Sequence, residues 1–270
     1  METLGNYQIV NYIQNFFEGG KRTCIAKDKN GKKVVIKQLC FAINNSNWSG
    51  YKALEKEIKA LKSLEHPYIP RYIESFESEL GSCLVSEYIE GEDLSKQTLK
   101  LDEIEKLLTS ILEILVYLQS KDPIIIHRDI KPQNIIRGKN GEYYLIDFGL
   151  AIESDKSLSL SSTLSGTIGF MPPEVLRGLK LGKSADLYSL GMAIYSLLSG
   201  KSGDRISKSL SSDFTINTKD IEKKIDKQFL NWLKTCLNHN PSKRFSSAKQ
   251  ALKYLKSIKV KDAPVKKSMK

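Results

Sequence analysis

The stretch that decides the fold reads His127-Arg128-Asp129-Ile130-Lys131-Pro132-Gln133-Asn134, and Asp147-Phe148-Gly149 follows it along the chain. Together the two motifs supply two carboxylates, an ammonium group and an amide at defined spacings. Asp129 can accept the proton of an attacking hydroxyl, and Lys131 can neutralise charge on a transferring phosphate. Asn134 and Asp147 offer the oxygen ligands that Mg²⁺ prefers. The set indicates phosphoryl transfer from a magnesium nucleotide.

Each of these residues has a simpler interpretation when it is taken alone. His127 could be a core histidine, Asp129 a turn residue or helix cap, and Asn134 another cap. The Asp147-Phe148-Gly149 motif could be an ordinary turn. Coincidence would have to supply every one of them in the right order, so we favour the catalytic interpretation.

The pattern H-R-D-x-K-P-x-N followed by D-F-G resembles the eukaryotic-like (Hanks-type) serine/threonine protein kinase family. The resemblance spans roughly Tyr7 to Ile258. It implies a serine/threonine protein kinase that transfers the γ-phosphoryl group of Mg-ATP to Ser/Thr hydroxyls of proteins, with Asp129 and Lys131 as catalytic residues. The implied cofactors are ATP and Mg²⁺, with Asn134 and Asp147 as the metal ligands.

The same resemblance implies an α+β, bilobal protein kinase fold. An antiparallel β-sheet with one helix is expected in residues 7–90, and a mostly helical lobe in residues 91–258. ATP is expected in the cleft between the two lobes. Residues 259–270 contain five lysines and are expected to form a solvated basic tail.

Two Asn-Gly pairs predict hairpins, because Asn-Gly suits the type I′ turn. Asn30-Gly31 precedes Val34-Val35-Ile36-Lys37, which resembles the kinase strand that ends in the phosphate-binding lysine. Asn140-Gly141 precedes a second strand that ends at Asp147. These hairpins are therefore expected to present Lys37 and Asp147 at strand ends.

A helix predicted over residues 51–63 supplies a partner for Lys37. At helical spacing Glu57 falls inside the apolar stripe that contains Leu54, Ile58 and Leu61. A carboxylate on a buried stripe is costly unless a positive group meets it. An ion pair between Lys37 and Glu57 is expected, and an exposed Glu57 at the edge of the stripe is the alternative.

The phosphate-binding loop departs from the family pattern G-x-G-x-x-G-x-V. Only Gly19 and Gly20 remain, and Lys21 or Arg22 stands where the last glycine is expected. A basic side chain could replace backbone contacts to phosphate, although a plain basic turn fits equally well. Gly-Gly-Lys/Arg loops favour a bacterial member of the family. The degenerate loop is also the single argument for a pseudokinase that keeps the fold with little or no turnover.

Leu84 to Gly91 is expected to be a strand followed by a hinge. The resemblance implies that the backbone of Glu87 and Ile89 binds adenine, that Asp93 lies near the ribose, and that Ser86 guards the pocket behind adenine. Because serine is small, we expect that pocket to be unusually open.

Dense apolar residues predict two buried helices, over residues 102–118 and 185–198. Within the resemblance, Asp186 binds the backbone of the catalytic loop and Glu174 pairs with Arg244, so both acids are structural. Seven Ser and Thr residues lie between 154 and 165, where a flexible polar loop and a phosphorylated activation loop are both compatible with the sequence.

Composition limits the remaining classes. The chain has 270 residues, 40% of them hydrophobic, and its four cysteines are far apart, which disfavours disulfide and zinc frameworks. The sequence predicts neither a signal peptide nor a membrane span, and a cytoplasmic location is expected. The net charge of +11 comes from scattered lysines without a nucleic-acid motif. ATP and a protein substrate are the expected partners, with no specific nucleic acid; a small-molecule kinase is a further alternative, and the oligomeric state stays open.

Overall fold

The computed structural model describes residues 2–16, 21–40, 48–153, 168–202, 204–211 and 213–263. The chain divides into two compact units. The first contains Met1–Glu90 together with Asp147–Leu150, and the second contains Gly91–Ile146 and Ala151–Lys270. The return of Asp147 to the first unit was not foreseen. Gly19, Gly20 and the serine-rich stretch from Ser154 to Thr167 lie outside the described residues.

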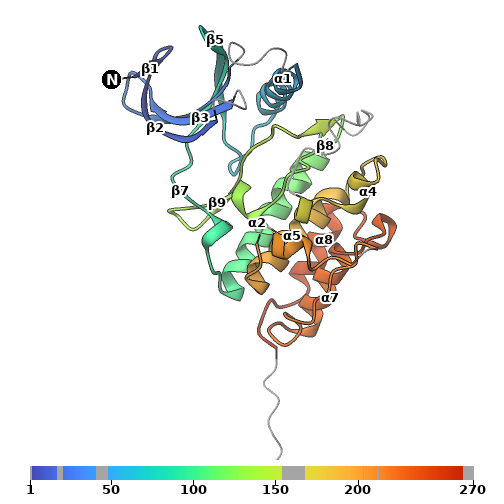
Figure 1. Ribbon diagram of the computed structural model, residues 1–270. Helices are drawn as coiled ribbons and strands as arrows, with labels where there is room; N and C mark the ends of the chain where they lie inside the picture. Colours follow the sequence, from blue (N-terminus) through green and yellow to red (C-terminus); the bar gives the residue numbers. More distant parts are fainter. Residues whose placement is uncertain are drawn as a thin grey trace, which may run out of the picture. The chain divides into compact units, whose positions relative to one another are not determined.

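The first unit is built on an antiparallel six-stranded sheet with the strand order β1-β2-β3-β4-β6-β5. One helix, α1, accompanies this sheet (Figure 1). The elements are β1 (Thr3–Leu4), β2 (Tyr7–Phe16), β3 (Lys21–Lys27), β4 (Lys33–Cys40), α1 (Trp48–Ser63), β5 (Tyr72–Ser78) and β6 (Gly81–Glu87).

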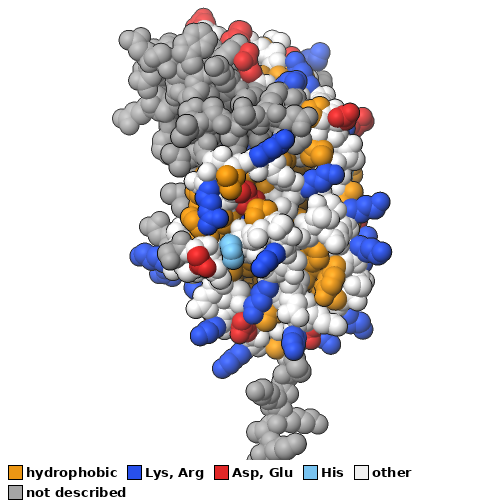
Figure 2. All heavy atoms as spheres, turned by 90° about the vertical axis from the view of Figure 1, so that its right-hand side faces the viewer, with side chains coloured by type: hydrophobic (Ala, Val, Ile, Leu, Met, Phe, Trp, Pro, Cys, Tyr) orange, Lys and Arg blue, Asp and Glu red, His pale blue; other side chains and the backbone are white. Residues whose placement is uncertain are grey.

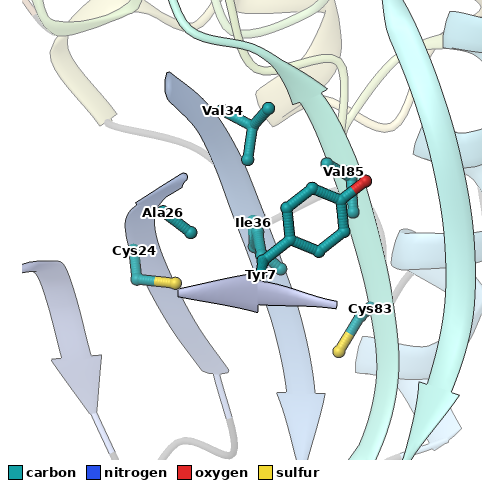
Figure 3. Packing of buried hydrophobic residues seen from close by; sticks show 7 residues of the cluster. All are labelled: Tyr7, Cys24, Ala26, Val34, Ile36, Cys83 and Val85. Carbon is teal, nitrogen blue, oxygen red and sulfur yellow. The ribbon is translucent and has the colours of Figure 1, made fainter. Parts of the chain in front are cut away.

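One face of this sheet forms a hydrophobic core. Alternate residues of three neighbouring strands lie on that face and converge with the side chain of Tyr7 (Figure 3). Successive strand residues point to opposite faces, so Lys37 lies on the other face from its neighbour Ile36. The core residues are Tyr7, Cys24, Ala26, Val34, Ile36, Cys83 and Val85.

The Asn-Gly hairpins are present, but their turns are not type I′. That turn requires positive φ at both central residues. Gly31 and Gly141 have φ of 79° and 80°, whereas neither Asn30 nor Asn140 is among the described residues with positive φ. The N–H of Gly31 donates to Asp28 O at 2.9 Å, and that of Gly141 to Gly138 O at 2.9 Å. In each hairpin the glycine thus forms a bulge in the left-handed conformation after an ordinary turn. Such a bulge increases the right-handed twist of the strands, so it is compatible with a hairpin.

The second unit is mostly helical and adds two small sheets, β10-β9-β7 and β11-β8 (Figure 1). Its two buried helices have nine and twelve buried residues, respectively, among those described. They are α2 (Leu101–Gln119) and α5 (Ala185–Ser199), which confirms the two predicted core helices. The other helices are η1 (Leu94–Lys96), η2 (Pro132–Asn134), η3 (Ile168–Phe170), α4 (Pro173–Leu176), α6 (Asp204–Ser207), α7 (Lys227–Cys236), η4 (Pro241–Lys243) and α8 (Ala248–Lys256), and the strands are β7 (Gly91–Asp93), β8 (Ile125–Ile126), β9 (Ile135–Gly138), β10 (Tyr143–Leu145) and β11 (Ile152–Glu153).

Residues 259–263, the described part of the expected basic tail, are held by backbone hydrogen bonds. The Asp226 N–H donates to Lys261 O at 2.9 Å, and the Ala263 N–H donates to Lys224 O at 3.3 Å. Val260 is buried. Residues 259–263 are therefore anchored to the second unit by one apolar side chain and by backbone hydrogen bonds, while the side chains of Lys259 and Lys261 are exposed, as the charge pattern predicted. No helix in the described part of the chain is long and apolar enough to cross a membrane.

Candidate active site

Lys37, Glu57 and Asp147 meet within the first unit. The Lys37 Nζ atom lies 2.5 Å from Glu57 Oε1 and 2.7 Å from Asp147 Oδ1. Glu57 projects from α1 with a side chain that is 7% exposed, so its charge is matched by Lys37 where water is largely excluded. The structure thus brings together the lysine and the glutamate that helical spacing selected.

The electrostatics of this triad keep Lys37 charged. Burial by itself lowers the pKa of an ammonium group, but Glu57 and Asp147 outweigh it, so the pKa of Lys37 is raised. The expected position of Lys37 at the end of its strand is wrong. Lys37 lies inside β4, which continues to Cys40 because the pairing with β6 extends to Gly81. The contact of Lys37 with Asp147, which the sequence assigned to magnesium, was not foreseen.

The backbone around Asp147 is unusual. Asp147 has φ of 67°, a left-handed backbone conformation that residues other than glycine rarely adopt. A Cβ atom at Gly149 would lie 3.2 Å from Glu57 Oε2 and 3.3 Å from Asp147 Oδ1. A side chain at Gly149 would therefore crowd both carboxylates that hold Lys37, which gives a physical reason for glycine in this motif.

Asp129, Lys131 and Asn134 form a second cluster, in the second unit. The Lys131 Nζ atom lies 2.8 Å from Asp129 Oδ2. The Asn134 Nδ2 group donates to Asp129 O and to Asp129 Oδ2, both at 2.8 Å. These contacts orient the Asp129 carboxylate and engage the nitrogen of the Asn134 amide. The amide oxygen is the remaining ligand atom of Asn134, and it suits Mg²⁺.

Asp186, at the start of α5, binds the backbone of the loop that carries Asp129. Asp186 Oδ2 accepts the N–H of His127 at 2.8 Å, and Asp186 Oδ1 accepts the N–H of Arg128 at 2.9 Å. Arg128 has φ of 70°, a strained conformation that such bonds maintain. Burial raises the pKa of Asp186, although His127 and the two N–H groups act in the opposite direction. The expected structural role of Asp186 is confirmed.

Glu174 and Arg244 also pair as expected. The guanidinium Nη1 and Nη2 atoms lie 2.7 Å and 2.8 Å from Glu174 Oε1 and Oε2, and both side chains are buried. Arg244 also donates to Asn238 O at 2.7 Å and to Ser184 O at 3.1 Å. The pair joins α4 to the segment before α8, so it is part of the architecture of the second unit.

The hinge residues show two local contacts that sequence reasoning did not anticipate. The N–H of Glu87 donates to Arg71 O at 2.9 Å. Asp93 accepts the N–H of Ser95 at 2.8 Å and caps η1. Ser86 lies in the sheet between Val35 and Tyr72 and is half-buried.

Arg22 does not take the place of a phosphate-binding glycine. It pairs with Gln38, whereas Thr23 pairs with Lys37, so Arg22 lies on the opposite face of the sheet from Lys37. Its guanidinium lies 4.4 Å from the centroid of the Tyr12 ring, and its Nη2 atom lies 3.3 Å from Glu2 Oε1. The hypothesis therefore fails for the side chain of Arg22, because strand register, which a loop motif does not specify, decides the face, and it stays a prediction for Lys21.

Comparison with known proteins agrees with this arrangement of residues. A family model described as "Protein kinase domain" matches residues 18–255. The chain is 35% identical to serine/threonine-protein kinase D of Synechocystis, over 96% of this chain and 53% of that protein. It is 32% identical to serine/threonine-protein kinase AtPK1/AtPK6 of Arabidopsis thaliana, over 80% of this chain and 47% of that protein. With Aurora kinase A-A of Xenopus laevis the identity is 30%, over 66% of this chain and 44% of that protein.

The chain therefore spans about half the length of these curated relatives. The family match covers most of the chain, including the catalytic motif around Asp129 and the Asp147-Phe148-Gly149 motif. On this evidence the chain belongs to the protein kinase family, in its Hanks-type serine/threonine branch.

Proposed function

We propose that this protein is an active serine/threonine kinase that transfers the γ-phosphoryl group of ATP to hydroxyl groups of protein substrates. The observation that carries the proposal is the Asp129 carboxylate, which is oriented by Lys131 and Asn134 at 2.8 Å. The complete ion pair of Lys37 with Glu57 supports the same activity, since kinases need it for catalysis.

Asp129 is the proposed base. It accepts the proton of the substrate hydroxyl as the oxygen of that hydroxyl attacks the γ-phosphorus. The bond from that phosphorus to the bridging oxygen breaks, and ADP leaves with the bond electrons. Lys131 is proposed to neutralise charge on the transferring group, and Lys37 to bind the α- and β-phosphates. Kinases of this kind turn over roughly 1–100 times per second. Positioning of the reactants and stabilisation of charge account for most of the rate enhancement over the uncatalysed reaction.

Asn134 and Asp147 are the proposed magnesium ligands, one through its amide oxygen and the other through its carboxylate. The donor set fits, because the Asn134 nitrogen is engaged by Asp129 and the amide oxygen is the ligand that remains. Bound Mg²⁺ would neutralise the charge that develops on the β- and γ-phosphate oxygens. Adenine is proposed to bind the backbone of Glu87 and Ile89.

Three other nucleotide contacts stay proposals. Asp93 is assigned to the ribose, although its carboxylate also caps η1. Gly19 and Gly20 are assigned to the phosphates by sequence position alone.

Domain limits of 7–90 and 91–258 are proposed for the two lobes.

A pseudokinase is the rival function, and the degenerate glycine loop is its single support. Transfer of radiolabelled phosphate from Mg-ATP to myelin basic protein, followed by phosphoamino-acid analysis, separates the two. Label on serine or threonine supports the kinase. If no label appears while ATP still raises the melting temperature, the protein binds nucleotide without turnover and the proposal fails.

Autophosphorylation between Ser154 and Thr167 is a further expected outcome. Phosphate in this serine-rich segment would add about −1.5 to −2 charge per site and could pair with basic residues such as Arg128. After incubation with Mg-ATP, mass spectrometry should find phosphate on one or more of these residues. The Asp129→Asn protein provides the control, and after the same brief incubation it should carry at least about a hundredfold less phosphate. An active enzyme that stays unmodified here would rule out autoactivation through this segment.

The small side chain of Ser86 predicts sensitivity to bulky inhibitors. A pyrazolopyrimidine with a benzyl group at C3 should inhibit at micromolar concentrations or below, because serine leaves room for the benzyl group. The matched variant Ser86→Met should be resistant while it keeps its KM for ATP. Equal inhibition of the two proteins, or resistance of the unaltered one, would show that Ser86 does not border the inhibitor site.

A further inference from the structure

Phe214 is held in a strained conformation by its own turn. Its φ is 64°, in the left-handed region, where an aromatic residue is an outlier. The N–H of Phe214 donates to Ser211 O at 2.9 Å, and Asp213 accepts hydrogen bonds from the Ser211 hydroxyl and from Thr215 Oγ1. These bonds, led by the one from Ser211, lower the pKa of Asp213 to about 2. Strain of this kind persists only where neighbours enforce it, and it concentrates at functional positions.

The conformation places the ring of Phe214 against Arg177. The guanidinium carbon of Arg177 lies 5.2 Å from the ring centroid, within cation–π range. Arg177 terminates α4, and Gly178 turns the chain with φ of 66°. The next residue, Leu179, donates its N–H to Glu174 O at 2.8 Å, yet its side chain is 53% exposed.

Both segments rest on the core of the second unit. Leu181 packs in a buried cluster with Met171 and Val175, which fixes the chain after Leu179. On the other side, a Cβ atom at Gly169 would lie 2.6 Å from Ile206 Cγ2, so α6 is seated directly on η3. Arg177 and Leu179, which are exposed, and the half-buried ring of Phe214 therefore lie next to the C-terminal end of α4.

The surface is basic. Residues 177–183 contain three cations and no carboxylate, and residues 204–211, which include α6, contain two cations and one carboxylate. Figure 2 views the molecule from the side of α4 and shows many basic and few acidic side chains on the part of this face that is not grey. The carboxylate of the adjoining turn, on Asp213, is engaged by Ser211 and Thr215. We call the set the docking surface: Arg177, Leu179, Lys180 and Phe214.

We propose that the docking surface binds an acidic segment of the protein substrate. Apolar side chains of that segment contact Leu179 and Phe214, and its carboxylates face Arg177 and Lys180. Opposite charge favours this occupant, whereas a second copy of the chain would bring two basic surfaces together. The inference rests on the proposed function, because it names the class of substrate that the kinase recognises.

The test measures binding and turnover separately. A fluorescein-labelled peptide of sequence Glu-Asp-Phe-Glu-Asp-Leu-Glu-Glu serves as the binding probe, with fluorescence anisotropy as the readout. The double variant Arg177→Glu/Phe214→Ala should bind at least tenfold more weakly than the unaltered protein. Affinity for the unaltered protein should also fall as salt increases, since the pairs are exposed. With dephosphorylated casein as an acidic substrate, the KM of the variant should rise about tenfold, equivalent to about 1.4 kcal/mol, with kcat and the KM for ATP unchanged.

A matched control comes from α8. Lys253→Glu/Tyr254→Ala reverses one exposed charge and removes one exposed aromatic ring from that helix, and it should bind the peptide as the unaltered protein does. Lys180→Glu, at an exposed position, repeats the test in case the double variant does not fold. It should weaken binding about threefold or more, the loss expected for one exposed charge pair.

Three results would overturn the proposal. One is peptide binding that is unchanged in both the double variant and Lys180→Glu. The second is unaltered protein that does not bind the peptide. The third is a dimer in sedimentation experiments that the double variant abolishes, which would assign the surface to a second copy. If no protein is phosphorylated but the peptide binds and the variants weaken it, the kinase proposal fails and the docking surface stands.

Discussion

Replacing Asp129 by asparagine should lower kcat by about 10²–10⁴-fold, the usual contribution of a general base. Asparagine has nearly the same shape as aspartate and keeps an oxygen near Lys131 and Asn134, so the loop should retain its conformation. The amide cannot accept the proton of the attacking hydroxyl. We therefore expect single-turnover phosphate transfer to be slowed while the shift in melting temperature caused by ATP is preserved.

The control for this experiment is Asp102→Asn, the same chemical change at an exposed carboxylate in the first turn of α2. It should change kcat by less than about twofold, because surface substitutions away from special features have small effects. An Asp129→Asn protein with the turnover of the unaltered enzyme would remove Asp129 from the proposed mechanism. Loss of the ATP-induced shift would indicate a folding defect instead.

Arg244→Ala should be the most destabilising single substitution of those considered. It leaves the Glu174 carboxylate buried without its counterion, and removal of one partner of a buried pair costs about 3–5 kcal/mol. The backbone carbonyls of Asn238 and Ser184 lose their donor as well. In calorimetry, the midpoint temperature of unfolding should be lower by on the order of 10 °C.

Two comparisons isolate the buried charge as the cause. Lys256→Ala breaks an exposed pair with Glu113, 3.6 Å apart, and should lower the free energy of unfolding by at most about 1 kcal/mol. Glu174→Gln/Arg244→Met removes both charges, and it should regain much of the stability that Arg244→Ala loses. If Arg244→Ala unfolds at the same temperature as Lys256→Ala, the pair is not a stabilising element.

The sequence by itself determined the family and the two buried helices, and it selected Lys37 and Glu57, which the structure pairs. The motif from His127 to Asn134 carries its information in local spacing. The helical positions of α2 and α5 follow from the density of apolar residues. Glu57 could be chosen from its helix because a carboxylate on an apolar stripe requires a partner, and Lys37 was the basic residue that the neighbouring motif offered.

Tertiary structure alone decided which distant groups meet and on which face they lie. Asp147 joins Lys37 across 110 positions of the chain, and Arg22 turns away from Lys37 because of strand register. The contact of Arg177 with Phe214 depends on a left-handed residue that no local pattern demanded. Spacing and periodicity describe one element at a time. Register, strained backbone and long-range charge pairing arise only when elements pack together, because their free energies depend on neighbours that are remote in sequence.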